Sequence, residues 1–158
     1  MPRKGLKNDF LMDIATFDGN PVLMSHSPNV HRQPTRRYLF AGGVVYYANY
    51  LKFMERARSE WLRAQGFEQD VLRDVAGVVF VVRRVEIDYL APARFNDALD
   101  VTVALHEAGR ASLVVRQELL RGEERLAKAD VTLACVDAAR FKPVKMPDSL
   151  VQALNCAP

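Results

Sequence analysis

Four consecutive segments between residues 78 and 138 alternate apolar and polar side chains and are joined by very short connections. They read VVFVVRRVEIDYL, ALDVTVALHEAG, RASLVVRQELLRGEE and RLAKADVTLACVDA. Alternation with a period of two is typical of strands that bury one face. The breaks at Gly109 and Gly122 are too short for crossover helices, which favours antiparallel pairing of successive strands. We therefore predict a curved antiparallel sheet of four or five strands.

A long amphipathic helix is predicted just before these strands. Gly66 follows its last apolar residue and marks the expected C-terminal end. A helix with one broad apolar face and a sheet with one apolar face pack most economically when the sheet folds around the helix. The predicted fold class is therefore α+β. The residues that share the apolar helical face are Tyr46, Tyr50, Phe53, Met54, Ala57, Trp61 and Ala64.

The remaining segments are less regular. Residues 1–33 are rich in Pro, Asn, Ser and His and show no sustained periodicity, so we predict a flexible leader before a single domain at residues 34–158. Met24 is an alternative start. The segment FEQDVLRDVAG is expected to be a short link, and PDSLVQAL is expected to be a short final helix.

Composition argues against several classes of function. The 22 basic and 19 acidic residues are mixed along the 158-residue chain, without the dense basic run typical of nucleic-acid binding. No apolar stretch reaches the roughly 20 residues of a transmembrane helix, and no secretory signal is recognisable, so we expect a cytoplasmic protein. Cys135 and Cys156 lack CxxC spacing and a nearby His. Nothing in the chain therefore predicts a metal site or another cofactor.

The segment RRYLFAGGVVYY, residues 36–47, joins a short apolar strand through a Gly-Gly turn to the predicted helix. The free N–H groups and the positive dipole end of a helix N-terminus stabilise a developing oxyanion. Gly42 and Gly43 would let the backbone approach a ligand closely. However, RRYLF contains no nucleophile, carboxylate or imidazole.

Three segments together identify a family resemblance: AGGVVYYANYLKFMERARSEWLR, VVFVVRRVEIDYLAPARFNDALDV and TLACVDAARFKPVKMP. Residues 36–150 resemble the hotdog-fold acyl-CoA thioesterases, in particular the branch associated with the Tol-Pal system and related to 4-hydroxybenzoyl-CoA thioesterase. The resemblance implies a hotdog domain that forms homodimers or homotetramers. It also implies an acyl-CoA substrate, or an acyl group on acyl carrier protein, bound at the dimer interface near the helix N-terminus.

Site residues follow from the resemblance position by position. The acyl-binding end falls on the turn that includes Gly42, Gly43, Val44 and Val45, and the oxyanion donor is the backbone N–H of Tyr47. In this branch a Glu-Asp-Thr-Asp segment precedes the turn, and its last Asp is the catalytic carboxylate. Here Phe40 takes that place. Phenylalanine can neither attack a thioester nor accept a proton.

Other residues are candidates for the missing role or for binding. Glu55 is the nearest carboxylate, and another hotdog branch places its catalytic Glu on the central helix; the alternative is an ion pair with a neighbouring arginine. Arg83 and Arg94 are candidates to meet the CoA phosphates, with solvated surface charge as the alternative. Tyr50 is either a ligand contact or a core residue.

Three interpretations remain open at this stage. The chain hydrolyses acyl thioesters with an unusual carboxylate, or it binds acyl-CoA or a protein partner with little hydrolysis because the Asp is absent. A third interpretation is that the segment before Ala41 is defective as read and that the true gene product contains the Asp.

Overall fold

The computed structural model describes residues 10–13, 44–94 and 97–156, and a five-stranded antiparallel sheet forms its centre. Its strands are β1 (Phe10–Asp13), β2 (Val78–Tyr89), β3 (Asp100–Ala108), β4 (Ser112–Arg121) and β5 (Glu124–Asp137). Their order across the sheet is β1-β3-β4-β5-β2. The four strands predicted from alternation are thus confirmed, and β3, β4 and β5 form a meander.

Strand β2 does not join the meander beside β3, its neighbour in sequence. It pairs instead with β5 along its whole length, from Val78 opposite Asp137 to Tyr89 opposite Ala127. The connection from β2 to β3 must therefore pass from one side of the sheet to the other. In doing so it passes the N-terminal end of the central helix, where Ala93 accepts a hydrogen bond from Val45.

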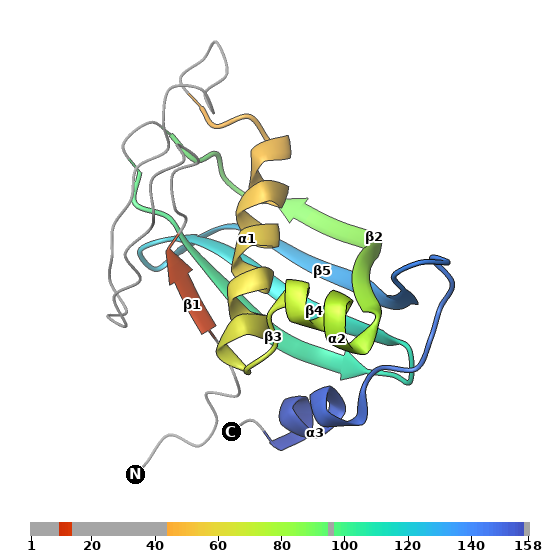
Figure 1. The fold of residues 1–158 in the computed structure, drawn as a ribbon. Helices are drawn as coiled ribbons and strands as arrows, with labels where there is room; N and C mark the ends of the chain where they lie inside the picture. Colours follow the sequence, from red (N-terminus) through yellow and green to blue (C-terminus); the bar gives the residue numbers. More distant parts are fainter. Residues whose placement is uncertain (1–9, 14–43, 95–96, 157–158) are drawn as a thin grey trace.

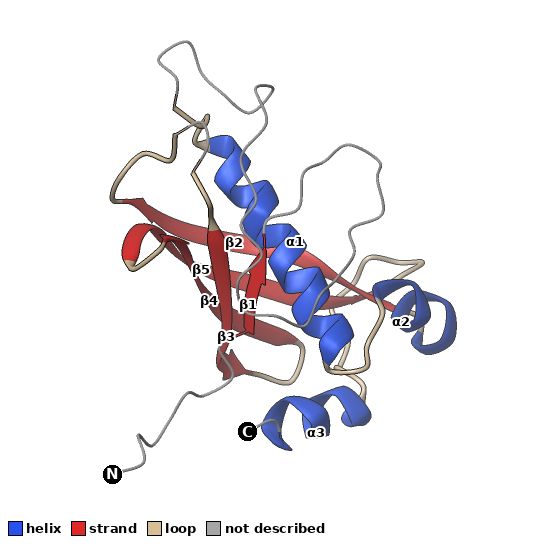
Figure 2. Cartoon of the chain, turned by 90° about the vertical axis from the view of Figure 1, so that its left-hand side faces the viewer, coloured by secondary structure: helices blue, strands red, loops and turns tan. Residues whose placement is uncertain are grey.

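The predicted long helix is α1 (Ala48–Ala64), and the sheet curves around it (Figures 1 and 2). Register shifts in the β2–β5, β3–β4 and β4–β5 pairs contribute to this curvature, because a bulge bends its strand. Gly66 lies just past the end of α1 with a left-handed φ of 88°, as predicted for a helix stop. The expected wrapping of a sheet around one long helix is confirmed.

The face of α1 that was predicted to be apolar does pack on the sheet, with differences at both ends. Tyr46 precedes the helix and is largely exposed, and Ala64 is exposed in the last turn. Arg58 is also buried, which is unusual for a charged side chain. It donates to the Gln117 side chain (2.8 Å), which in turn donates to the Met54 carbonyl (2.9 Å). Burial is tolerated because these bonds satisfy the polar atoms.

Two further helices lie near the C-terminal end of α1 in both views (Figures 1 and 2). The predicted final helix is α3 (Asp148–Cys156). The other, α2 (Gln69–Ala76), occupies the segment expected to be a link. It was missed because Leu72 is its only buried residue while Val71 and Val75 face solvent, so the apolar residues do not define a buried face. Gly77 ends it with a φ of 67°.

Strand β1 was not expected, because it lies within the predicted leader. Its residues pair with β3, from Phe10 opposite Val103 to Asp13 opposite Asp100. The rest of the predicted leader lies outside the described residues. None of the helices in the described part of the chain is long and apolar enough to cross a membrane.

Candidate functional site

A cavity of about 520 Å³ opens at the N-terminal end of α1. It is formed by the segment that enters the helix, by the first turn of the helix, and by the end of β2 with the residues that follow it. Its walls are apolar and aromatic. The lining residues are Val44, Val45, Tyr46, Tyr47, Tyr50, Tyr89, Leu90, Ala91 and Pro92.

The helix that points into this region has an uncapped N-terminus. Tyr47 is its N-cap, makes no side-chain capping bond, and no acidic residue occupies the first turn. The N-cap carbonyl accepts the Tyr50 N–H (3.2 Å). Within the described part of the chain, the Tyr47 N–H donates to no oxygen. This end of α1 therefore offers an unused donor together with the positive end of the helix dipole.

Four tyrosines surround the same end of the helix. The ring of Tyr89 stands edge-on to that of Tyr47, with centroids 5.8 Å apart, and lies 5.4 Å from that of Tyr50. The Tyr89 hydroxyl donates to the Tyr47 carbonyl at 3.1 Å. The ring of Tyr46 lies 4.7 Å from that of Tyr47. Strand β2 is thereby tied directly to the start of α1.

Three of these tyrosines have pKa values above that of a free phenol. Burial raises the pKa of both Tyr50 and Tyr89 above the usual value for a phenol. A hydrogen bond with Tyr47 raises the pKa of Tyr46. These three hydroxyls therefore stay protonated at neutral pH, and none of them can serve as the general base of a hydrolysis.

One side of the cavity is lined by Leu90, Ala91 and Pro92, the first three residues of a segment, 90–94, that we call the wall segment. Its Ala93 is fully buried, donates its N–H to the Tyr50 hydroxyl (2.7 Å) and accepts the Val45 N–H (2.8 Å). An isolated antiparallel bridge joins Arg94 to Val44. The wall segment is thus bonded both to the first turn of α1 and to the residues that enter the helix.

The residues predicted from the sequence divide into three groups. Val44, Val45, Tyr47 and Tyr50 come together in the cavity, and Arg94 lies beside it. Glu55 lies on the exposed side of α1 and is not among the described residues that line the cavity. Arg83 is exposed at the bulge of β2. Phe40, Gly42 and Gly43 lie outside the described residues.

Sequence reasoning missed the contribution of the YLAP segment. Tyr89, Leu90, Ala91 and Pro92 line the cavity, yet Tyr89 appeared only as one apolar member of an alternating strand. Their position in the highly specific stretch YLAPARFND was the available signal. In the described residues, no group of three His, Cys, Asp or Glu side chains is placed to hold a metal ion.

A family model and individual relatives both match this chain to thioesterases. The model of the thioesterase superfamily matches residues 42–128, more than half of the chain. An acyl-CoA thioesterase, YbgC, from Haemophilus influenzae is 42% identical over 115 residues, which cover 73% of this chain and 85% of that protein.

Solved structures agree with this result. A probable thioesterase from Bartonella henselae superposes with a TM-score of 0.70 at 34% identity, covering 75% of this chain and 97% of that one. A thioesterase from Thermus thermophilus, crystallised with coenzyme A and Zn, gives a TM-score of 0.68 at 28% identity, covering 80% of this chain and 90% of that one. The chain belongs to the thioesterase superfamily and has the hotdog fold.

Proposed function

We propose that the protein hydrolyses acyl-CoA thioesters in the cytoplasm, at the cavity beside the N-terminus of α1. The observation that carries this proposal is the Tyr47 N–H, which has no acceptor among the described residues, at the edge of an apolar cavity. The similarity to acyl-CoA thioesterases supports the substrate class. An acyl group on acyl carrier protein presents the same thioester and is the second substrate to test.

The cavity has the groups needed to bind an acyl thioester. The thioester carbonyl oxygen would accept the Tyr47 N–H, and the acyl chain would lie against Val45, Leu90 and Pro92. When water attacks, the carbonyl oxygen becomes an oxyanion, and the donor and the helix dipole stabilise it. The C–S bond then breaks, releasing a carboxylic acid and the thiol of coenzyme A.

Arginines outside the cavity would bind the phosphates of coenzyme A. The Arg94 side chain is exposed beside the cavity, and its guanidinium has no ion-pair partner among residues 44–94 and 97–156. Arg83 is similarly exposed and unpaired within those ranges, whereas its neighbour Arg84 pairs with Glu86. Unpaired guanidinium groups are suited to phosphate recognition.

The active unit would be a homodimer, or a tetramer built from it. Strand β2 is an edge of the sheet, and it exposes Val82 by 49% and Val81 by 36%. A long edge strand with exposed valines is prone to pair with another chain. Since β2 ends at Tyr89, a second copy along this edge would lie close to the cavity. Size-exclusion chromatography with light scattering on the wild type and Val82→Lys tests this arrangement.

Glu55 remains the candidate carboxylate for activating water. Its side chain is exposed, and its charge acts on buried Arg58, where it favours the protonated guanidinium. Participation would require that the assembled oligomer bring it toward the bound thioester.

A second candidate function is acyl-CoA binding with little turnover. It is favoured by the cavity itself, because none of its described lining residues carries a carboxylate, an imidazole or a thiol. The sequence has Phe40 where the family's Asp is expected, and the absence of that carboxylate also favours binding with little turnover.

Thiol release from short-, medium- and long-chain acyl-CoA, and from acyl carrier protein, separates the two functions. We expect turnover by the purified wild type above the uncatalysed rate and its loss in Glu55→Gln. Glu107→Gln, an exposed glutamate on β3, is the matched control. Tight CoA binding with turnover at background would replace the enzyme proposal by the binding proposal. Unchanged turnover in Glu55→Gln would exclude Glu55 as the base.

Phe40→Asp is a complementary test. A large gain in rate would indicate that the remainder of the site is intact and that the carboxylate is the missing element. No gain would mean that Phe40 does not occupy the position of the family's Asp. Resequencing the 5′ part of the gene tests whether the segment before Ala41 is genuine.

A further inference from the structure

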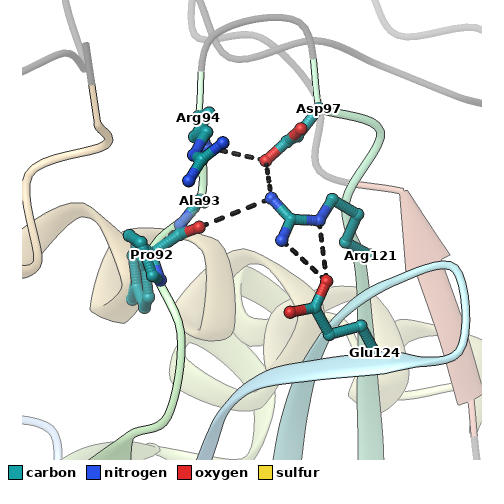
Figure 3. Close-up of polar contacts among 7 residues, drawn as sticks. Pro92, Ala93, Arg94, Asp97, Arg121 and Glu124 are labelled. Atoms are coloured by element: carbon teal, nitrogen blue, oxygen red, sulfur yellow. Dashed lines mark hydrogen bonds and ion pairs between the residues drawn. The ribbon is translucent and has the colours of Figure 1, made fainter.

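A cluster of charged side chains lies beside the wall segment (Figure 3). Its members Asp97, Arg121 and Glu124 are not among the described residues that line the cavity. Its centre is Arg121, the last residue of β4. Arg121 Nη1 donates to Asp97 Oδ2 at 2.6 Å and to the Pro92 carbonyl at 3.4 Å. On its other side, Nε and Nη2 both donate to Glu124 Oε2, at 3.1 and 2.7 Å. One guanidinium therefore joins the β4–β5 turn to the connection between β2 and β3.

Asp97 connects this cluster to the backbone of the wall segment. Its Oδ2 accepts the Arg94 N–H at 2.7 Å, and its own N–H donates to the Arg94 carbonyl at 3.2 Å. The carboxylate thus pairs with the Arg121 guanidinium and accepts the backbone N–H of Arg94 at the same time. The two side chains are only 17% (Asp97) and 29% (Arg121) exposed, so their attraction is less weakened by solvent than that of a surface pair.

Both backbone polar groups of Ala93, within the wall segment, bond to residues of the site. Ala93 bonds to Tyr50 through its N–H and to Val45 through its carbonyl. Both partners line the cavity, and Val45 lies two residues before Tyr47. Arg121 and Asp97 do not line the cavity; they hold the segment that does.

We propose that Asp97 and Arg121 are positioning residues for thioester hydrolysis, acting by fixing the wall segment against Val45 and Tyr50. This inference rests on the proposed function, since it names residues that orient the same site. The ion pair holds Ala93 in position. The two hydrogen bonds of Ala93 then fix the Val45 backbone and the Tyr50 hydroxyl, and these two residues determine how the substrate reaches the Tyr47 N–H. Because small displacements of a reacting group slow the reaction strongly, loosening this series of contacts lowers kcat.

Hydrogen exchange tests the structural part independently of activity. In Arg121→Gln we expect the amides of Val45 and Ala93 to exchange about tenfold faster, because each opens when the wall segment detaches. The amides of Leu90 and Ala91 serve as internal controls. They lie at the start of the same segment but bond to the Leu126 carbonyl, at 2.8 and 3.1 Å. Their protection should stay close to wild type.

Kinetics tests the functional part. We expect Arg121→Gln and Asp97→Asn each to lower kcat about tenfold with KM changed less than about threefold. Arg121→Lys keeps one charged donor and should recover part of the loss. Glu124→Gln is the matched control: it removes an Arg121 partner that touches only the β4–β5 turn, so kcat should stay within about twofold of wild type.

Each outcome decides the proposal. Unchanged exchange of Val45 and Ala93 in Arg121→Gln would overturn it, and so would equal acceleration of all four amides, which would indicate a general loss of stability. Faster exchange without a fall in kcat would also overturn it. If the wild type itself shows no hydrolysis, the proposed function fails, and the positioning role fails with it, while the exchange data still establish whether the ion pair orders the segment.

Discussion

Two hollows of equal size illustrate what distinguishes a binding site in this protein. The cavity beside α1 and a hollow over strands β2, β4 and β5 both measure about 520 Å³. The second, which we call the charged hollow, is lined by Glu86, Asp88, Arg116, Glu118, Arg125, Lys128, Ala129 and Asp130. Volume alone does not separate them.

The difference lies in whether their polar groups are already paired. In the charged hollow, Arg116 makes two bonds to Asp130, at 2.8 and 3.0 Å. Arg125 pairs with Glu118 at 2.9 Å, and Lys128 pairs with Asp88 at 3.3 Å. A ligand would have to break these pairs. The cavity beside α1 instead combines apolar walls with a backbone donor that has no partner in the described chain. This contrast favours the cavity beside α1 as the binding site and makes the charged hollow a surface whose charges are already paired.

The strongest challenge to this contrast is to fill each hollow with the same bulky side chain. Ala91→Trp should lower kcat/KM about a hundredfold, because the indole occupies the space of the acyl chain. Lys128→Trp places the same side chain in the charged hollow and should leave kcat/KM within about twofold. Steady-state kinetics on both variants measures the effect. Equal losses in the two variants would remove the distinction between the hollows.

A finer test concerns the tyrosine that ties β2 to the helix. Tyr89→Phe removes only the hydroxyl that binds the Tyr47 carbonyl. We expect the free energy of unfolding, measured in urea, to decrease by about 1 kcal/mol and kcat/KM to fall about three- to tenfold. Tyr50→Phe should destabilise more, by about 1–3 kcal/mol, because Tyr50 is 2% exposed and the buried Ala93 N–H would lose its acceptor. A larger decrease in the free energy of unfolding for Tyr89→Phe than for Tyr50→Phe would contradict this ranking.

The charged hollow should matter little for either activity or stability. Arg116 and Asp130 are 50% and 35% exposed, so solvent screens their attraction. Arg116→Gln should therefore reduce the free energy of unfolding by less than about 1 kcal/mol and leave thioester hydrolysis unchanged. Urea denaturation and thiol release measure the two effects. A tenfold loss of activity would show that this face takes part in the reaction.

The smallest expected effect is the pH dependence of that same pair. The hydrogen bond from Arg116 lowers the pKa of Asp130 in the folded protein. A depressed carboxyl pKa stabilises the fold above the unfolded value of about 3.9, and the contribution is lost as the pH falls through the folded pKa. The difference in unfolding free energy between wild type and Arg116→Gln should therefore be present at pH 7 and shrink below about pH 4. A difference that grows on acidification would contradict this assignment.

The fold was largely predictable because its main elements have strong periodicity. Helix α1 and strands β3 to β5 bury at least one face, and β2 partly buries Phe80, Val85 and Ile87 against the core. That burial is what produces the 3.6- and 2-residue patterns. Helix α2 has a single buried residue, Leu72, and therefore no such pattern. Strand β1 has only four residues, too few to show sustained alternation.

The site was only half predictable for a different reason. Val44, Val45 and Tyr47 are contiguous with a recognisable turn, so the resemblance pointed to them, and Tyr50 follows one helical turn later, where the sequence left a ligand contact and a core position as alternatives. The opposite wall, from Tyr89 to Pro92, reaches the site because β2 pairs with β5 and its connection crosses the end of α1. That arrangement depends on sheet order, which local patterns do not encode. The buried Arg58 is similar, because its partner Gln117 lies on a distant strand.

The most direct test of the proposed mechanism replaces the Tyr47 N–H, the donor that would polarise the thioester carbonyl. Proline has no N–H, and the Tyr47 φ of −56° already suits its ring. We expect Tyr47→Pro to lower kcat about 100- to 1,000-fold while remaining folded. Tyr47→Ala keeps the donor and loses only the largely exposed ring, so it should retain most of the activity. Equal kcat values for Tyr47→Pro and Tyr47→Ala would contradict the account.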